Sequence, residues 1–238
     1  MAPPPLYAAA VESSQLLGLL LWYPVLLFSL TFHEAAHAWA ARRGGDSTAY
    51  LGGQVSLDPR PHIRREPFGT VFAPLLSFAW GGFMIGWAST PYDPRWAMAH
   101  PRRAAWMALA GPAANALLLL AVAVAIRAGV GAGVFEGSEG YGAIVSSVQG
   151  GFWDTLARLL SIAFLLNLLL LVFNLIPLPP LDGSGAVALV LPEAWALRLR
   201  QVFQNPSFAF GGILVAWLAI REIFPPVLRG AVQLLYAF

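Results

Sequence analysis

Two histidines and a glutamate stand close together inside an apolar stretch, in the order His33-Glu34-Ala35-Ala36-His37. On a helix, positions i and i+4 share a face, so His33 and His37 can each direct a ring nitrogen toward one metal ion, with Glu34 beside it. The pattern is typical of a zinc hydrolase, in which the glutamate serves as general base. Burying three ionisable groups in apolar surroundings is costly without such a partner. The alternative is a pair of helix histidines hydrogen-bonded to their neighbours.

A catalytic zinc site needs a further protein ligand and one open position for water. Because the chain has no cysteine, that ligand must be a histidine or a carboxylate. Asp182 is the best anionic candidate, since it follows a proline-rich break in a hydrophobic segment, and irregular backbone at membrane depth is tolerated mainly where protein or water lines it. The alternative for Asp182 is a surface turn residue in an Asp-Gly pair.

Two asparagines lie in apolar segments and have two possible roles each. Asn115 and Asn174 could tie helices together through their amides, or could hold a substrate carbonyl. Asn174 stands just before the proline-rich break, which favours substrate contact as much as structure. For Asn115 the residues alone leave both roles open.

The composition indicates a polytopic membrane protein. Of the 238 residues, 58% are hydrophobic and 11% are charged, and the mean hydropathy is +0.66, which is too apolar for an ordinary soluble domain. The formal net charge of +2 is small and scattered, so we expect no nucleic acid partner.

The expected fold class is all-α, with about four to five spanning helices. Segments apolar and long enough to cross a bilayer lie at residues 14–41, 104–128, 155–176 and 207–224, and a short apolar tail follows at 227–238. An amphipathic interfacial helix is expected over residues 186–204. We expect a single membrane domain over residues 1–238, with its core at 14–185 and its C-terminal helices at 186–238.

Two connecting segments complete the expected fold. Residues 46–67 suggest a short strand or hairpin after the first helix, whose edge at 50–57 could pair with an extended peptide, the alternative being a plain connector. Residues 68–88 are apolar but contain Pro74 and Gly81-Gly82, and arginines flank them on both sides. A re-entrant segment satisfies the positive-inside rule better than a full crossing would. It also brings Asp182 to the same face as His33.

The arginines predict the orientation of the site. The first span ends at Arg42-Arg43, which the positive-inside rule places on the cytoplasmic side. At a helical rise of about 1.5 Å per residue, His37 lies roughly 8 to 9 Å inside these arginines. The candidate metal site is therefore submerged in the membrane but close to its cytoplasmic face.

Three motifs together resemble the site-two protease family of intramembrane zinc metalloproteases. They are His-Glu-Ala-Ala-His at 33–37, Gly-Pro-Ala-Ala-Asn at 111–115 and Asn-Leu-Ile-Pro-Leu-Pro-Pro-Leu-Asp-Gly at 174–183, in that order on three hydrophobic segments. The resemblance implies that His33, His37 and Asp182 bind one Zn²⁺ per chain, that Glu34 activates water, and that Asn174 positions the substrate.

The resemblance also implies a biological setting. The chain is similar to the compact prokaryotic members of that family, which lack a PDZ-like domain. These would be multi-pass proteins of a prokaryotic cell membrane with the active site toward the cytoplasm. The expected partners are the lipid bilayer and a transmembrane protein, whose spanning segment is hydrolysed near the cytoplasmic face.

The competing hypothesis is a membrane protein that binds zinc for transport or structure without proteolysis. A transporter would need polar residues along a path formed by several helices. In this chain the ionisable residues of the apolar segments concentrate in one helix and one bend, which favours the protease.

Overall fold

The computed structural model describes residues 5–138, 143–203 and 205–237. In this part of the chain four helices are long and apolar enough to cross a membrane, and the only strands form one small sheet. The expected all-α polytopic fold class is therefore confirmed. The four helices are α1 (Pro5–Gly44), α6 (Pro101–Gly131), α7 (Phe152–Asn174) and α10 (Pro206–Tyr236).

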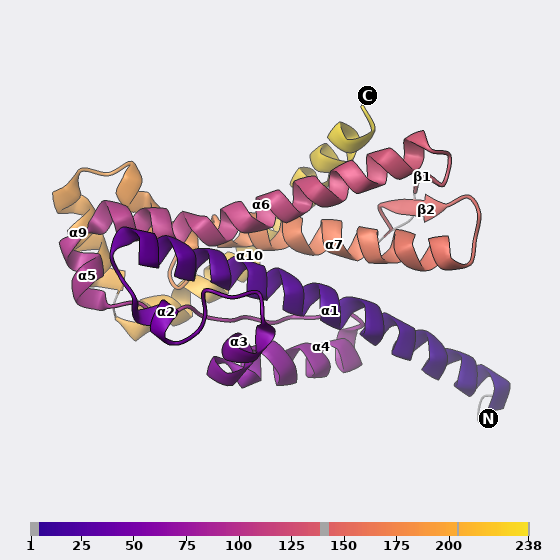
Figure 1. The fold of residues 1–238 in the computed structure, drawn as a ribbon, viewed down its shortest axis with the longest axis horizontal. Coiled ribbons are helices and arrows are strands. Elements are labelled where there is room, and N and C mark those ends of the chain that lie inside the picture. Colours follow the sequence, from indigo (N-terminus) through magenta and orange to yellow (C-terminus); the bar gives the residue numbers. More distant parts are fainter. Residues whose placement is uncertain (1–4, 139–142, 204, 238) are drawn as a thin grey trace.

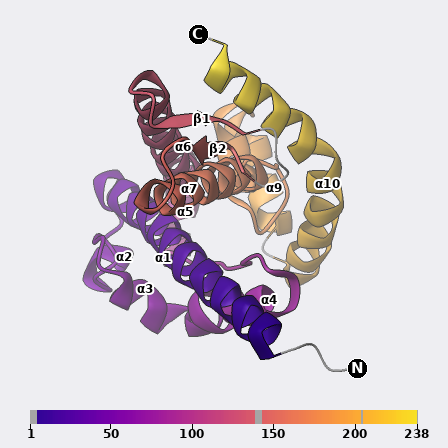
Figure 2. The ribbon, with the colours of Figure 1, turned by 90° about the vertical axis from the view of Figure 1, so that its right-hand side faces the viewer.

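The four long helices pack against one another, with α7 in contact with the other three (Figure 1). Seen from one end, α7 lies between α1, α6 and α10 (Figure 2). One buried cluster joins α6, α7 and α10 through residues such as Ile126, Phe164 and Leu235, and a second joins α1 to α7 through Leu26 and Leu166. Elsewhere these helices expose large apolar side chains, as expected where a helix faces lipid.

The strand expected after the first helix is wrong. Thr48–Leu51 form the short helix α2, and Pro59–Arg65 form α3. Asp58 caps α3 by accepting a hydrogen bond at 3.0 Å from the backbone N–H of Arg60, with Pro59 at the first helical position. Directly after α2, Gly53 adopts a φ of 75° and Gln54 N donates to Ala49 O at 3.0 Å, so the chain turns within residues 50–54 and no strand forms at 50–57.

The strands lie in the connector between α6 and α7 instead. β1 (Phe135–Gly137) and β2 (Val145–Ser147) pair as an antiparallel hairpin, with Phe135 opposite Ser147. Phe135 and Val145 are buried against the ends of the long helices. The hairpin therefore closes the end of the bundle remote from the arginine-rich loops.

Residues 68–93 leave the bundle wall and return to it, which agrees with the expected re-entrant path. The segment begins with η1 (Phe68–Phe72) and α4 (Ala73–Gly81), and it reverses at Gly82, whose φ of 71° suits glycine. It then runs back extended, so that Trp87 N donates to Gly69 O at 3.0 Å. At its base Ser89 Oγ donates to Glu66 Oε1 at 2.7 Å.

Asp46 fixes the end of this returning segment to the end of α1. Its carboxylate accepts hydrogen bonds from Thr48 N at 2.9 Å and from Asp93 N at 2.8 Å. Burial raises the pKa of Asp46, but the hydroxyl of Thr48, which donates to Oδ1 at 2.6 Å, and the two backbone N–H groups together lower it by more, so the pKa lies below its usual range. The helix α5 (Pro94–Ala99) then leads directly into α6.

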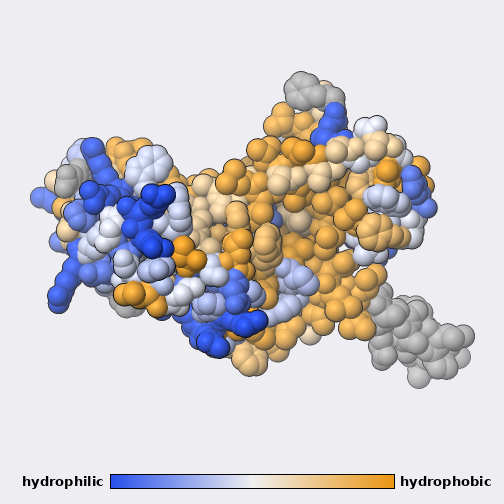
Figure 3. All heavy atoms as spheres, in the orientation of Figure 1, coloured by the Kyte–Doolittle hydropathy of each residue, from blue (hydrophilic) through white to orange (hydrophobic). Residues whose placement is uncertain are grey.

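The C-terminal region follows the expected pattern with one addition. Beyond α7 lie α8 (Asp182–Ala186), η2 (Val187–Leu189) and the amphipathic α9 (Glu193–Phe203). α10 continues through Pro225 and Pro226 without ending, so the apolar tail extends the last span. Hydrophilic side chains gather at the end of the molecule that carries α2, α5 and α9, and hydrophobic ones cover the middle (Figure 3).

The return of residues 68–93 predicts a labelling pattern. The chain has no cysteine, so Arg60→Cys and Ala99→Cys, both at exposed positions, can each be labelled alone in sealed vesicles with a membrane-impermeant maleimide. Both should react from the same side of the membrane, because the segment between them does not cross it. A cysteine at Gln149, beyond α6, serves as the control and should react only from the other side. Labelling of Arg60→Cys and Ala99→Cys from opposite sides would contradict the re-entrant path.

Candidate metal centre

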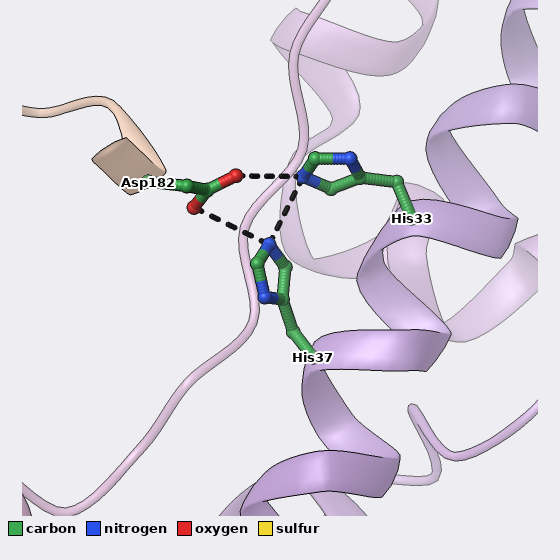
Figure 4. A group of neighbouring side chains, drawn as sticks. All are labelled: His33, His37 and Asp182. Carbon is green, nitrogen blue, oxygen red and sulfur yellow. Dashed lines mark hydrogen bonds and ion pairs between the residues drawn. The ribbon is translucent and has the colours of Figure 1, made fainter. Parts of the chain in front are cut away.

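Three of the residues singled out in the sequence come together between α1 and α8 (Figure 4). His33 Nε2 lies 3.0 Å from Asp182 Oδ2, His37 Nε2 lies 3.3 Å from Asp182 Oδ1, and the two Nε2 atoms are 2.9 Å apart. Both histidines are only 5% exposed. Three potential ligand atoms therefore converge on one point in a buried setting.

Helix geometry and the proline-rich bend supply these positions. His33 and His37 lie one turn apart on α1, so they share a face. α7 ends at Asn174, and the prolines that follow lead to α8, in which Asp182 is the first residue. Gly183 lets α8 approach closely, because a Cβ there would lie 2.5 Å from the carbonyl oxygens of Leu175 and Ile176.

The other ring nitrogen of each histidine is already engaged. His37 Nδ1 lies 2.7 Å from the backbone oxygen of Met107, and since a carbonyl only accepts, Nδ1 carries the proton. His33 Nδ1 lies 2.6 Å from Asn115 Oδ1. Histidines that bind metals usually donate their second N–H in this way, which fixes the tautomer and the ring orientation.

A chain of amides settles the direction of the His33 contact. Asn167 Nδ2 donates to the carbonyl of Ala163 at 2.9 Å, so the other side-chain atom of Asn167 is its oxygen. That oxygen accepts from Asn115 Nδ2 at 3.0 Å, which leaves Asn115 Oδ1 facing His33. Asn115 and Asn167 are 0% and 2% exposed. Asn115 therefore ties α6 to α7 and orients His33, the first of the two roles left open for it.

The converging atoms suit a cation. With both Nδ1 atoms donating, the two Nε2 lone pairs and the Asp182 carboxylate are all acceptors facing one another, an arrangement that is repulsive without a positive charge between them. Asp182 Oδ2 is also a buried oxygen without a hydrogen-bond donor. Two imidazoles and one carboxylate are the ligand set of several catalytic zinc sites.

Gly111 keeps the space beside these atoms open. A Cβ built on Gly111 would collide with Nε2 of both His33 and His37. The site therefore requires glycine at this position of the Gly-Pro motif on α6, since any side chain there would enter the space that the ligand atoms face.

Glu34 lies beside the cluster with its carboxylate held in place. Thr90, from the extended returning segment, donates its hydroxyl to Glu34 Oε2 at 2.7 Å and lies 2.9 Å from the Glu34 backbone oxygen. A cavity of about 270 Å³ adjoins the cluster and is lined by residues including Glu34, His37, Thr90 and Asp182. The carboxylate can therefore meet both a water molecule and a substrate in this cavity.

Asn174 is not brought to the cluster. Its side-chain nitrogen donates to the backbone oxygen of Leu170 at 3.1 Å, one turn back on α7. Several residues that hold the site had no signal in the sequence, because they are ordinary polar or small residues that only the packing brings there. These are Thr90, Met107 and Asn167.

Comparison with known proteins agrees with this geometry. The sequence profile described as "Peptidase family M50" matches residues 23–218. A Bacillus subtilis protein named "Putative zinc metalloprotease YwhC" is 29% identical over 214 residues, which cover 90% of this chain and 88% of the relative. No solved structure gives a significant match.

Two mycobacterial relatives share the same description under the name Rip2. The Mycobacterium tuberculosis H37Rv protein is 32% identical over 193 residues, covering 81% of this chain and 64% of the relative. The Mycolicibacterium smegmatis protein is 31% identical over 217 residues, covering 89% of this chain and 70% of the relative.

Gly111→Ala is expected to abolish zinc binding without unfolding the protein. The added methyl group would occupy the space beside both histidine Nε2 atoms, so metal content measured by atomic emission should fall from one zinc per chain to near zero. Gly131→Ala is the matched control on the same helix, because a Cβ there meets nothing within 4 Å. A Gly111→Ala protein that retains a full zinc complement would contradict the assigned cavity.

Asn115→Ala is expected to weaken zinc binding by about 10- to 100-fold, the usual effect of removing a residue that orients a ligand. Asn115→Asp should retain more of the affinity, since its carboxylate can still accept from His33 Nδ1. Competition with a chromophoric chelator measures both affinities. If Asn115→Ala binds zinc as tightly as the parent chain, the contact with His33 does not orient the ligand.

Proposed function

The chain belongs to peptidase family M50, and on this premise we propose that it hydrolyses peptide bonds within the transmembrane segments of other membrane proteins. It is a zinc metalloprotease and an integral membrane protein. We also propose the class of substrate, the side of the membrane on which the active site lies and the roles of individual residues.

The observation that carries the proposal is the placement of the buried cluster on a spanning helix. His33, Glu34 and His37 lie within the span Gln15–Gly44 and are each 5% exposed. Ionisable residues at such positions are costly and usually mark a functional site. A protease whose catalytic groups lie at this depth meets peptide bonds that are themselves in the membrane.

The reaction assigns a task to each residue. His33, His37 and Asp182 would hold the zinc ion, which when bound acts as a Lewis acid and lowers the pKa of water toward about 7. Glu34 takes the proton from the attacking water and returns it to the leaving amine nitrogen. Thr90 keeps the Glu34 carboxylate turned toward the cavity through its 2.7 Å hydrogen bond.

The substrate must expose its backbone before this chemistry can occur. In a helix the amide groups are hydrogen-bonded within the segment and surrounded by side chains, so a transmembrane substrate has to unwind locally at the scissile bond. Asn174 would steady the substrate peptide through its amide oxygen and its second N–H, since its side-chain nitrogen already donates one hydrogen bond to Leu170.

The arginines favour a site near the cytoplasmic face of a prokaryotic cell membrane. Of the fourteen arginines in the chain, eight lie in residues 42–103 and two lie in α9. The C-terminal end of α1, the helices α5 and α9 and the start of α6 lie at the end of the bundle where hydrophilic side chains gather (Figures 1 and 3). The positive-inside rule places that end in the cytoplasm.

Glu34→Gln is expected to lower the cleavage rate by at least about 10²- to 10⁴-fold, the usual contribution of a general base. The amide is isosteric and is not a zinc ligand, so the zinc content should stay at one per chain. The assay is cleavage of a reporter with one transmembrane helix, reconstituted with the protease in liposomes. Full activity of Glu34→Gln would contradict the role of this residue as the base.

The same liposomes test the substrate class. Mass spectrometry of the fragments should place the cut within the spanning segment of the reporter, toward the end that shares a side with Arg42 and Arg43. Fragments cut only in soluble loops, and absent with Glu34→Gln, would show a protease that does not act inside the membrane.

A further inference from the structure

A groove formed by α1, α6 and the C-terminal end of α7 combines an apolar lining with a cationic end. Its volume is about 630 Å³, and its lining is apolar except at one end, where Arg43 and Arg103 contribute. Trp39 and Trp106, which are 54% and 64% exposed, form parts of the walls. The cavity lies at the junction between a basic surface and the hydrophobic surface of the spans.

A second apolar groove continues from the first along α1 and α6, with residues 55–57 of the connector forming another part of its lining. Its volume is about 540 Å³, and the two grooves share Trp39, Ala110 and Ala113. The small side chains of Ala110 and Ala113 leave the surface hollow between the helices, and Trp39 lines both grooves. Together they make a long channel that starts at the arginines and follows α1 and α6 into the region of the spans.

The two arginines are held at the mouth of the groove by contacts that leave donors available. Arg103 Nη1 donates to the backbone oxygen of Gly44 at 3.2 Å, and the Arg43 guanidinium lies 5.5 Å from the centre of the Trp39 ring. Within the described residues neither guanidinium is paired with a carboxylate. Each arginine therefore retains N–H groups that can bind an anion.

We propose that this groove is a binding site for an anionic phospholipid. Its phosphate lies between Arg43 and Arg103, and its acyl chains lie along the apolar channel past Trp39. Guanidinium groups suit phosphate because they offer several donors in one plane. Basic pockets between spanning helices, at the level of the headgroups, bind such lipids by the same combination of charge and apolar contact.

The position of the two cations at one end of an otherwise apolar groove favours a lipid over a protein helix as the occupant. The cations are confined to one end of the groove, and the rest of its lining has almost no polar atoms. A phospholipid has this distribution, with one anionic group at the interface and only hydrocarbon below it. A protein segment would need an acidic residue at one particular depth to match it.

The test compares lipid binding by matched arginine variants of the full chain, purified in a neutral detergent. The double variant Arg43→Gln with Arg103→Gln removes the charges that line the groove, whereas Arg42→Gln with Arg102→Gln removes the same charge from adjacent exposed positions outside it. Native mass spectrometry with added phosphatidylglycerol or phosphatidylcholine counts the bound lipids. We expect the first variant to lose phosphatidylglycerol affinity by about tenfold or more and the second to retain it.

A further variant tests the acyl channel. Ala113→Trp places a bulky side chain at an exposed position shared by both grooves, and it should lower phosphatidylglycerol binding while all four arginines remain. Equal loss in both arginine variants, or equal binding of phosphatidylcholine by the parent chain, would overturn the proposal. The proposal would also be overturned if the Ala113→Trp variant bound phosphatidylglycerol as the parent chain does but no longer bound a reporter transmembrane helix, since the groove would then hold protein.

Discussion

The structure depends on bringing three acceptor atoms together in a place where they repel one another. His33 Nε2, His37 Nε2 and the Asp182 carboxylate lie about 3 Å apart, and both histidines are almost fully buried. Without a cation this arrangement is unfavourable, so the rest of the protein must hold it in place. Metal binding then offsets the cost, and it links α1 to the bend after α7, two parts of the chain that are far apart in sequence.

The sequence predicted the site because its spacing is a local property. The i, i+4 spacing places both histidines on one face of any helix, whatever the tertiary structure. The four spans also follow directly from the length of the apolar runs. Asp182 was harder to assign, since it lies on the same side of the membrane as His33 only if an even number of spans separates them. The positive-inside rule favoured that number by making residues 68–88 re-entrant, and the 3.0 Å hydrogen bond between Trp87 N and Gly69 O shows the chain returning.

What the sequence could not supply are the contacts made by packing alone. Nothing in the residues around Thr90 or Asn167 marks them as neighbours of Glu34 and Asn115, because those contacts join segments far apart in the chain. The strand expected at 50–57 failed for a local reason. Alternating apolar residues favour a strand only weakly, whereas the helical turn Thr48–Leu51 closes with Gln54 N donating to Ala49 O and with Gly53 at a left-handed φ of 75°.

Different elements orient the metal ligands and the catalytic base. The spans α1, α6 and α7 carry the amide chain that orients His33, so metal affinity rests on rigid packing between helices. The base is oriented differently, by a hydroxyl on an extended segment that does not cross the bundle. Extended backbone with few internal hydrogen bonds moves more readily than a packed helix. Changes in the returning segment should therefore alter the turnover of bound substrate while the metal stays in place, whereas changes at Asn115 or Asn167 act on the metal first.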